Sequence, residues 1–378
     1  MKSNRIVVIS LLFLAICGCQ TQQVDRRIED GVEIVTNQVE PYRVEGQPSS
    51  LQLEEVMVLD TENPIVAATG LVDINAFQVD SQGGIYLLSQ RGEDHFFFKF
   101  THEGKFVRSF GLKGQGPGEM GFPILPRMLP QDRLAVTDVM KKLMVFDVDG
   151  NVVSETRIDP NFVIVNPLDN GNSVVFWKAG AEDTAAEHFN EKTSLFSRDG
   201  KEIQALDVLD IGRQARFLDP VFAWHINRDS IFQINEQRGY EILVFGSEGS
   251  LVRKIQKQYE PVRLSPETRE VLLQGFPENS PLRDPAITPE QLPPIHALFS
   301  DEAGRLYAVT FEKGERQAEY WCDIFNRDGA FFARVSLPVH FGRNPFPIYA
   351  LIKNQHLYCI GEKENGFQQM KIFRMIWN

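Results

Sequence analysis

The chain has 378 residues, of which 43% are hydrophobic and 28 are phenylalanine, enough for a large buried core. Its formal net charge is -12 at pH 7. A surface this acidic disfavours nucleic acids and anionic lipid surfaces as partners, because both are themselves negatively charged.

The first residues have the pattern of an export signal. Lys2 and Arg5 form a charged start, an apolar run follows over residues 6–16, and small residues precede Cys19. The apolar run is shorter than the roughly 20 residues that a membrane-spanning helix needs. Its end, "ICGC", resembles the bacterial lipobox, in which a signal peptidase cuts before a lipidated cysteine. An ordinary signal peptide with a chance cysteine is the alternative.

The lipobox resemblance implies removal of residues 1–18 and lipidation of Cys19, which would anchor the chain to a bacterial membrane. Gln20 is not the aspartate that holds some lipoproteins at the inner membrane, so the resemblance favours the outer membrane. The folded part would then face the periplasm or the cell surface. Cleavage would remove Lys2 and Arg5 and no acid, leaving 37 basic and 51 acidic residues and a charge of -14.

A repeated phrase indicates the architecture. An apolar strand ends in phenylalanine. In five places this phenylalanine is followed by two other residues, then an acid, then a glycine. The acid–glycine pairs lie between alternating strands and predict hairpin turns whose glycines have positive φ. The phenylalanines are separated by 46, 50, 49, 80 and 48 residues, and the long interval contains an insertion at residues 261–294 that holds eight of the 21 prolines. The key residues are Phe100, Phe146, Phe196, Phe245, Phe325 and Phe373.

Two further apolar strands precede each hairpin, so a unit of about 48 residues holds four short strands. Six such units predict an all-β fold, a six-bladed β-propeller with four-stranded blades. The sixth unit ends before its outer strand, whereas residues 50–60 form a strand without a partner. We expect this N-terminal strand to complete the last blade and close the ring, because that removes two open sheet edges. The propeller would span residues 50–378, with residues 19–49 as a tether in which residues 30–37 could form an additional surface strand.

The stretch "GLKGQGPGEMGFP" satisfies G-x-G-x-x-G at Gly116, Gly118 and Gly121. A dinucleotide site requires this motif between a strand and a helix, because the helix N-terminus binds the pyrophosphate. Here "FPILPRMLP" follows, and its three prolines prevent a helix. The P-loop sequence Gly-Lys-Ser/Thr is also absent, so the motif does not indicate nucleotide binding.

Together with "RLAVTDVMKKLMVFDVDGNVV" downstream, this stretch resembles an NHL-type propeller repeat. Residues 30–378 resemble the bacterial six-bladed β-propeller lipoproteins, most closely over the first two blades, whereas the insertion at residues 261–294 departs from that family. In the family the glycine-rich loop joins the outer strand of one blade to the inner strand of the next. The resemblance implies that Gly114, Gly116 and Gly118 serve loop conformation, with a place at a ligand mouth as the alternative.

Motifs for catalysis are few. The chain has no G-x-S-x-G nucleophile elbow, no H-E-x-x-H and no paired C-x-x-C. His225 and His296 fall on predicted inner strands of blades 4 and 5, which line a propeller's channel, and Asn75 aligns with His296. Such a ring resembles the way six-bladed lactonase-like hydrolases hold a divalent cation; side chains that only hydrogen-bond channel water are the alternative. The possible acids for a cation site are Glu119, Asp138 and Asp301.

Two further features leave alternatives open. Cys322 and Cys359 lie in apolar strand-like runs, which suits either buried thiols or a disulfide. In the insertion, Ser265 as N-cap and Pro266 at the first helical position predict a short helix, followed by an extended loop. The expected apolar side of that helix consists of Val271, Leu272 and Phe276. This segment is either a partner contact or a surface elaboration without function.

The sequence therefore favours an exported propeller lipoprotein that binds a protein, peptide or glycan without catalysis and without a cofactor. The alternative is a metal-dependent hydrolase or lyase with a divalent cation in the central channel. A binding module requires an exposed apolar or aromatic patch, whereas the enzyme requires converging carboxylates, amides or histidines.

Overall fold

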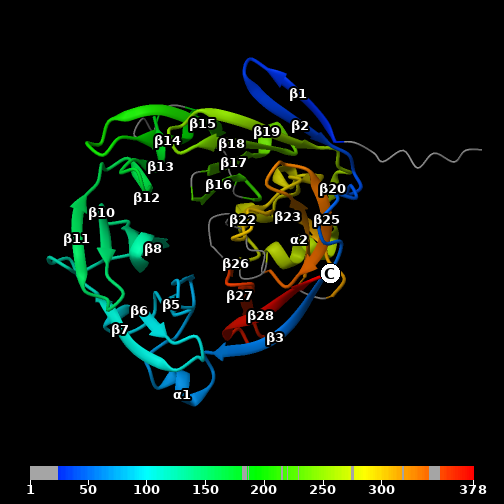
Figure 1. The fold of residues 1–378 in the computed structure, drawn as a ribbon. Helices are drawn as coiled ribbons and strands as arrows, with labels where there is room; N and C mark the ends of the chain where they lie inside the picture. The colour runs from blue at the N-terminus through cyan, green and yellow to red at the C-terminus, as the bar shows by residue number, and fades with distance from the viewer. Residues whose placement is uncertain are drawn as a thin grey trace, which may run out of the picture.

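The computed structural model describes residues 24–180, 185, 187–213, 216–218, 220–228, 230–273, 276–316, 319–339 and 350–378. These residues form six sheets of mainly antiparallel strands, arranged as blades around a central channel, and one small two-stranded sheet outside the blades (Figure 1). The predicted six-bladed β-propeller is therefore confirmed.

Each blade runs from an inner strand beside the channel to an outer strand at the rim. Blade 1 consists of β4 (Ala76–Val79), β5 (Ile85–Leu88), β6 (His95–Phe100) and β7 (Phe106–Leu112). Blade 2 consists of β8 (Pro123–Leu129), β9 (Arg133–Asp138), β10 (Lys142–Phe146) and β11 (Val152–Arg157). Blade 3 consists of β12 (Phe162–Pro167), β13 (Ser173–Ala179), β14 (His188–Phe196) and β15 (Glu202–Gly212).

Blade 4 contains β16 (Phe222–Asn227), β17 (Ser230–Asn235), β18 (Glu241–Gly246) and β19 (Leu251–Lys257). Blade 5 contains β22 (Ala297–Ser300), β23 (Leu306–Lys313), β24 (Tyr320–Phe325) and β25 (Phe331–Leu337). Blade 6 contains β26 (Ala350–Lys353), β27 (His356–Glu362), β28 (Gln368–Trp377) and, from the other end of the chain, β3 (Leu51–Asp60). The short helix α1 (Pro64–Ala67) connects β3 to blade 1, and the 3₁₀ turns η1 (Pro130–Asp132) and η2 (Glu236–Arg238) lie within blades 2 and 4.

The repeated phenylalanine occupies the third strand of every blade. In all six blades the pairing with the outer strand shifts register immediately before this residue. Five of the six side chains are buried, and Phe373 is half-buried. The glycines of the five acid–glycine hairpins have φ between 79° and 88°, as predicted. One local motif, a bulge at phenylalanine followed by a tight turn, therefore occurs in full in five blades. The sixth blade has the bulge at Phe373 without the turn.

The N-terminal strand closes the ring as predicted. β3 pairs antiparallel with β28 over nearly its whole length. Before it, β1 (Asp25–Glu29) and β2 (Val32–Asn37) form a hairpin, and β2 pairs in parallel with β19, so blade 4 has six strands. The surface strand allowed for residues 30–37 is thus present, and residues 25–37 of the expected tether form a hairpin that is part of the blade 4 sheet.

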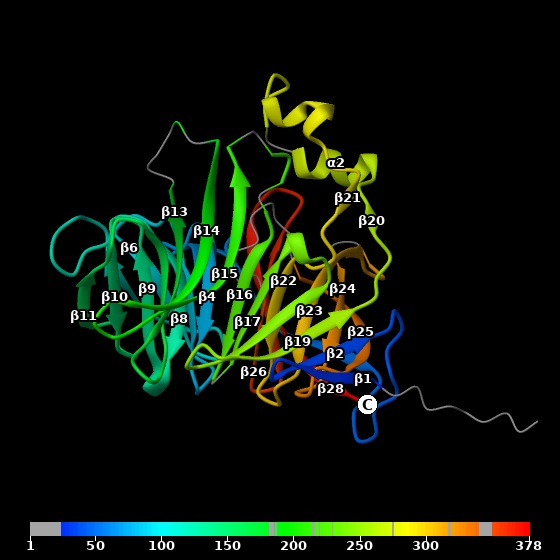
Figure 2. The same cartoon turned by 90° about the horizontal axis from the view of Figure 1, so that it is seen from above.

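The insertion stands above one face of the ring (Figure 2). It contains β20 (Val262–Arg263), α2 (Pro266–Leu273), the 3₁₀ turns η3 (Pro281–Arg283) and η4 (Pro285–Ile287), and β21 (Gln291–Leu292). The helix begins as predicted, because Ser265 Oγ accepts a hydrogen bond from the Thr268 amide at 3.1 Å. Leu272 and Leu273 pack on Phe217 in a small core of their own. The segment after the helix was expected to be an extended loop, but it contains two 3₁₀ turns. Ser280 caps the first turn before Pro281, and Asp284 caps the second before Pro285.

The two cysteines lie on different blades, Cys322 on β24 and Cys359 on β27, and both are buried free thiols. Burial raises the pKa of both thiols, that of Cys359 to about 12, so both are protonated at neutral pH. Among the described segments, no helix has the length and apolar character needed to cross a bilayer.

Candidate functional site in the central channel

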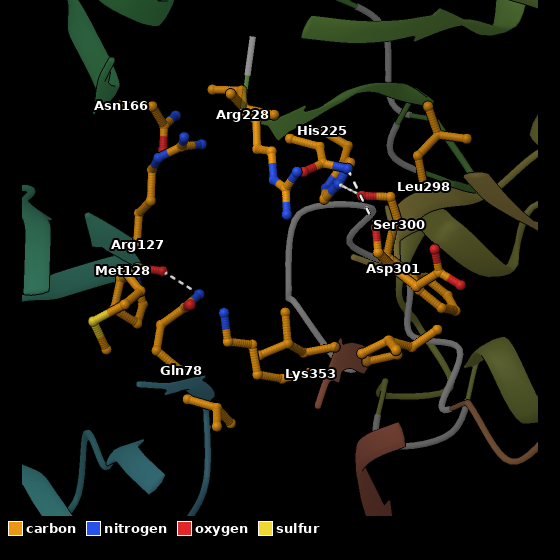
Figure 3. Close-up of a pocket in the computed structure, with 18 of the residues that line it drawn as sticks. Gln78, Arg127, Met128, Asn166, His225, Arg228, Leu298, Ser300, Asp301 and Lys353 are labelled. Atoms are coloured by element: carbon orange, nitrogen blue, oxygen red, sulfur yellow. Dashed lines mark hydrogen bonds between the residues drawn. The ribbon is translucent and has the colours of Figure 1, made fainter. Parts of the chain in front are cut away.

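The central channel contains a cavity of about 540 Å³ to which all six inner strands contribute (Figure 3). A ligand in this cavity would touch every blade, so the site depends on closure of the ring. Polar lining residues, one from each inner strand, are Gln78 of β4, Arg127 of β8, Asn166 of β12, His225 of β16, Ser300 of β22 and Lys353 of β26.

Three cationic side chains face the cavity: Arg127, Arg228 and Lys353. Figure 3 shows Arg228 and Lys353 extending from opposite sides of the ring, while Arg127 lies along the wall beside Asn166. Lys353 Nζ is 3.2 Å from a carboxylate oxygen of Glu302. Within the described residues neither arginine forms an ion pair, and Arg127 Nε is buried without a hydrogen-bond partner.

An irregularity in β8 directs Arg127 toward the channel. The pairing of β8 with β9 shifts register between Ile124 and Arg127, and Leu125 in this interval has φ 45°. From blade 1, Gln78 Nε2 donates a hydrogen bond to the Pro126 carbonyl at 2.8 Å, in a buried position. Bulges of this kind change the direction of a side chain, and a non-glycine residue at positive φ is strained. The neighbouring blade therefore holds the strained segment that orients Arg127.

Burial and mutual repulsion determine the charges in the cavity. Burial lowers the pKa of the Arg127 guanidinium to about 10, an effect that Asp169 opposes, so the group stays charged at neutral pH. Burial, and after it the charge of Arg127, lowers the pKa of His225 to about 3. The neutral His225 ring lies with Nε2 2.7 Å from Ser300 Oγ. The cavity thus combines fixed positive charge with an uncharged imidazole.

Four acids also border the cavity, and three of them have protein donors as partners. These contacts join strands within a blade or tie neighbouring blades together. Asp132 accepts from Ser81 N at 2.8 Å and Ser81 Oγ at 2.7 Å, Glu302 from Asn354 N at 3.0 Å, and Asp301 from Arg305 N at 2.9 Å and Tyr307 Oη at 3.1 Å. The fourth, Asp169, lies exposed in the turn after β12.

The structure brings only part of the predicted channel set together. His225, His296 and Asp301 line the cavity. Asn75 is exposed before β4, where its Oδ1 accepts from the Gln90 amide at 2.9 Å, and it does not line the cavity. Among the described residues, no three His, Cys, Asp or Glu side chains are grouped so that they could hold a metal ion.

The two remaining predicted acids shape the glycine-rich loop instead of lining the cavity. Glu119 Oε2 accepts from the Gly116 amide at 2.8 Å. Asp138, at the end of β9, accepts from the amides of Gly121 and Phe122 at 2.8 Å each. Both carboxylates satisfy backbone donors that the loop leaves unpaired, which is why they do not reach the channel cavity.

The loop over residues 113–122 joins the outer strand of blade 1 to the inner strand of blade 2, as the family resemblance implied. A Cβ atom on Gly114 would overlap the Glu119 carboxylate, so this position requires glycine. The Gly118 amide donates to Glu155 Oε2 at 2.7 Å, and Lys142 Nζ donates to the Gly116 carbonyl at 2.9 Å. These hydrogen bonds attach the loop to blade 2.

Comparison with known proteins agrees with this architecture. The family DUF5128, described as a 6-bladed beta-propeller, matches residues 71–208, most of the first three blades. No curated protein matches the chain.

Two crystal structures share the fold. A protein of Bacteroides fragilis NCTC 9343, named for its inferred export, has a TM-score of 0.56 at 13% identity, covering 91% of this chain and 99% of that one. A DUF4221 family member from Bacteroides vulgatus atcc 8482 has a TM-score of 0.50 at 10% identity, covering 88% of this chain and 100% of that one. At these identities the likeness extends to the fold alone.

Proposed function

We propose that the chain is a cell-envelope binding scaffold that takes part of a protein, a peptide or a glycan into its central channel without transforming it. The observation that carries this proposal is the cavity of about 540 Å³, lined by polar side chains from all six inner strands. Pockets with a few polar groups held on rigid strands are typical of ligand sites. The proposed ligands do not include a nucleic acid, because a chain with a net charge of -12 repels the phosphate backbone.

A metal-dependent hydrolase or lyase has weaker support. A divalent cation in the cavity would be repelled by Arg127, Arg228 and Lys353, and three of the four acids at the cavity already accept hydrogen bonds from the protein. Glu119 and Asp138, which could have supplied ligands, are bound to loop amides. The proposal therefore includes no cofactor.

We further propose export and lipidation at Cys19, a residue outside the described part of the chain. The leader pattern over residues 1–19 supports this proposal. The inferred export of the Bacteroides fragilis protein that shares the fold agrees with it. In cells expressing the full chain, Cys19→Ala should abolish labelling with radioactive palmitate and release the protein from membranes. Lipid labelling that persists in this variant would contradict the assignment.

Binding can be tested with the mature protein, purified in detergent from membranes, on arrays of peptides and glycans. Ala297 lines the channel, so the bulky indole of Ala297→Trp should obstruct it and remove the binding seen with the wild type. The matched control is Lys201→Trp, on an exposed hairpin at the rim, which should bind normally. Melting curves establish that each variant is folded. Array binding that survives Ala297→Trp, or no binding at all by the wild type, would overturn the channel as the ligand site.

A further inference from the structure

We propose that the channel binds an oxyanion group of its ligand, a carboxylate, sulfate or phosphate, between Arg127, Arg228 and Lys353. This inference rests on the proposed function and specifies the chemistry of its ligand. It is carried by three observations: an unsatisfied buried donor, strained backbone at both arginines, and acids that are engaged elsewhere.

The first observation is the state of Arg127. Its Nε is buried without a hydrogen-bond partner in the described part of the chain, and Asp169 is the acid of that part whose charge acts on the guanidinium. A buried charged donor left unsatisfied is costly, so such groups usually have a partner. A planar guanidinium pairs best with the two oxygens of a carboxylate, sulfate or phosphate. A ligand oxyanion would therefore satisfy a donor for which the described residues provide no acceptor.

The second observation is that both arginines depend on unfavourable backbone. Leu125, two residues before Arg127, has φ 45°, and Arg228 itself has φ 46°. Arg228 lies in the two-residue turn between the paired residues Asn227 and Ser230, a place where asparagine or glycine is favoured. Backbone strain of this kind occurs in tight turns and also clusters at ligand sites, where it can hold a side chain in place for function. Here it places two arginines at the same cavity.

The third observation concerns the acids. Among the described residues, Glu302 forms an ion pair with Lys353 and also accepts from the Asn354 amide, whereas Asp169 acts on Arg127 through its charge without forming an ion pair. Asp132 and Asp301 are engaged by donors of the protein. The lining carries three cationic side chains and four acids, so the positive charge is concentrated at Arg127 and Arg228, which form no ion pair among the described residues, and is not spread over the whole cavity. A small anion can approach these two guanidinium groups, whereas a chain with a net charge of -12 repels extended polyanions.

The test uses the purified mature protein with four probes at constant ionic strength: sodium glucuronate, sulfate, phosphate and uncharged glucose. A compound that binds only the folded state raises the melting temperature with concentration. We expect at least one oxyanion to stabilise the protein and glucose to have no effect. The three anions distinguish a carboxylate, a sulfate or a phosphate as the preferred group.

Variants locate the effect. Arg127→Gln and Lys353→Gln should each weaken binding of the effective anion about tenfold, the loss expected for one charged hydrogen bond. Arg228→Gly should weaken it similarly while raising the melting temperature without ligand, because glycine adopts φ 46° without strain. Lys201→Gln removes an exposed charge remote from the channel and should leave the affinity unchanged.

The inference would be overturned if no anion stabilised the protein, or if all three channel variants retained the stabilisation. If array ligands are lost in Ala297→Trp but bind normally to the charge variants, the scaffold function stands and the oxyanion site fails. If nothing binds in the channel, both proposals fail.

Discussion

Lys257 Nζ lies 3.4 Å from the Asp323 carboxylate, and the side chains are only 3% and 1% exposed. The pair joins β19 of blade 4 to β24 of blade 5. Tyr240 Oη donates to Asp323 at 2.6 Å, and Lys257 Nζ lies 5.1 Å and 4.7 Å from the ring centres of Tyr240 and Phe331. A buried charge pair thus links two blades through long-range contacts.

Removing one member of this pair should destabilise the ring strongly. Asp323→Ala leaves Lys257 buried without its counter-charge, and such losses cost about 3–5 kcal/mol. Chemical denaturation of the mature protein measures the effect. The double variant Lys257→Met/Asp323→Leu should be closer to wild type than Asp323→Ala, because the buried lysine charge is removed and Arg334, also 3.5 Å from Asp323, keeps Glu312 as its partner at 2.6 Å. If Asp323→Ala loses no more stability than the surface variant Lys201→Ala, the pair does not act as a blade link.

The sequence allowed the fold to be predicted because its signals are local. A phenylalanine, a short spacer and a glycine turn recur at nearly constant intervals, and counting strands leaves one unpaired strand at each end of the chain. The parallel pairing of β2 with β19 was harder to predict, since it joins residues over 200 positions apart. Only the alternation at residues 30–37 indicated that a strand could form there.

The candidate site was only partly predictable. His225 and His296 were assigned to predicted inner strands; both line the cavity, His225 from β16 and His296 from the position before β22. Arg127, Arg228 and Lys353 were missed because single charges near turns usually face solvent. The sequence signal that could have identified Arg228 and Lys353 is their location at the ends of two inner strands. The direction of Arg127 could not be predicted in this way, because it depends on a bulge that no local motif specifies.

Asp138 distinguishes a structural from a ligand-binding role for the glycine-rich loop. Asp138→Ala leaves the amides of Gly121 and Phe122 without their acceptor, and we expect a loss of about 2–4 kcal/mol in unfolding free energy. Ligand binding by the folded fraction should be unchanged. Thermal melts and the array assay together measure this. A variant of normal stability that no longer binds would assign Asp138 to the ligand site instead.

The closing strand gives a test of ring integrity. Deleting residues 51–60 removes β3 and exposes the edge of β28, so the cooperative melting transition should be lost. The control deletes residues 25–31, which contain β1, a strand whose five residues are all exposed. That deletion should leave a cooperative transition. Two equal melting curves would mean that β3 is not needed to close the ring.

His225 makes stability depend on pH. Its folded pKa of about 3 lies below the ordinary value of 6.5, so between these values the unfolded chain binds a proton that the folded protein does not. The contribution is therefore fully present above pH 6.5 and is lost as the pH falls toward 3. Each pH unit in this window corresponds to about 1.4 kcal/mol, so by pH 4.5 the loss is roughly 2–3 kcal/mol.

His225→Gln isolates this contribution, because glutamine does not titrate and can still hydrogen-bond Ser300. Between pH 7 and pH 4.5 the variant should lose roughly 2–3 kcal/mol less unfolding free energy than the wild type. Urea denaturation at both pH values measures the difference. His102→Gln is the matched control, since His102 is 65% exposed and its replacement should leave the pH dependence unchanged. Equal pH dependence in wild type and His225→Gln would show that His225 is hydrated and titrates normally, and a hydrated ring would also mean that the cavity wall is open to water beside Arg127.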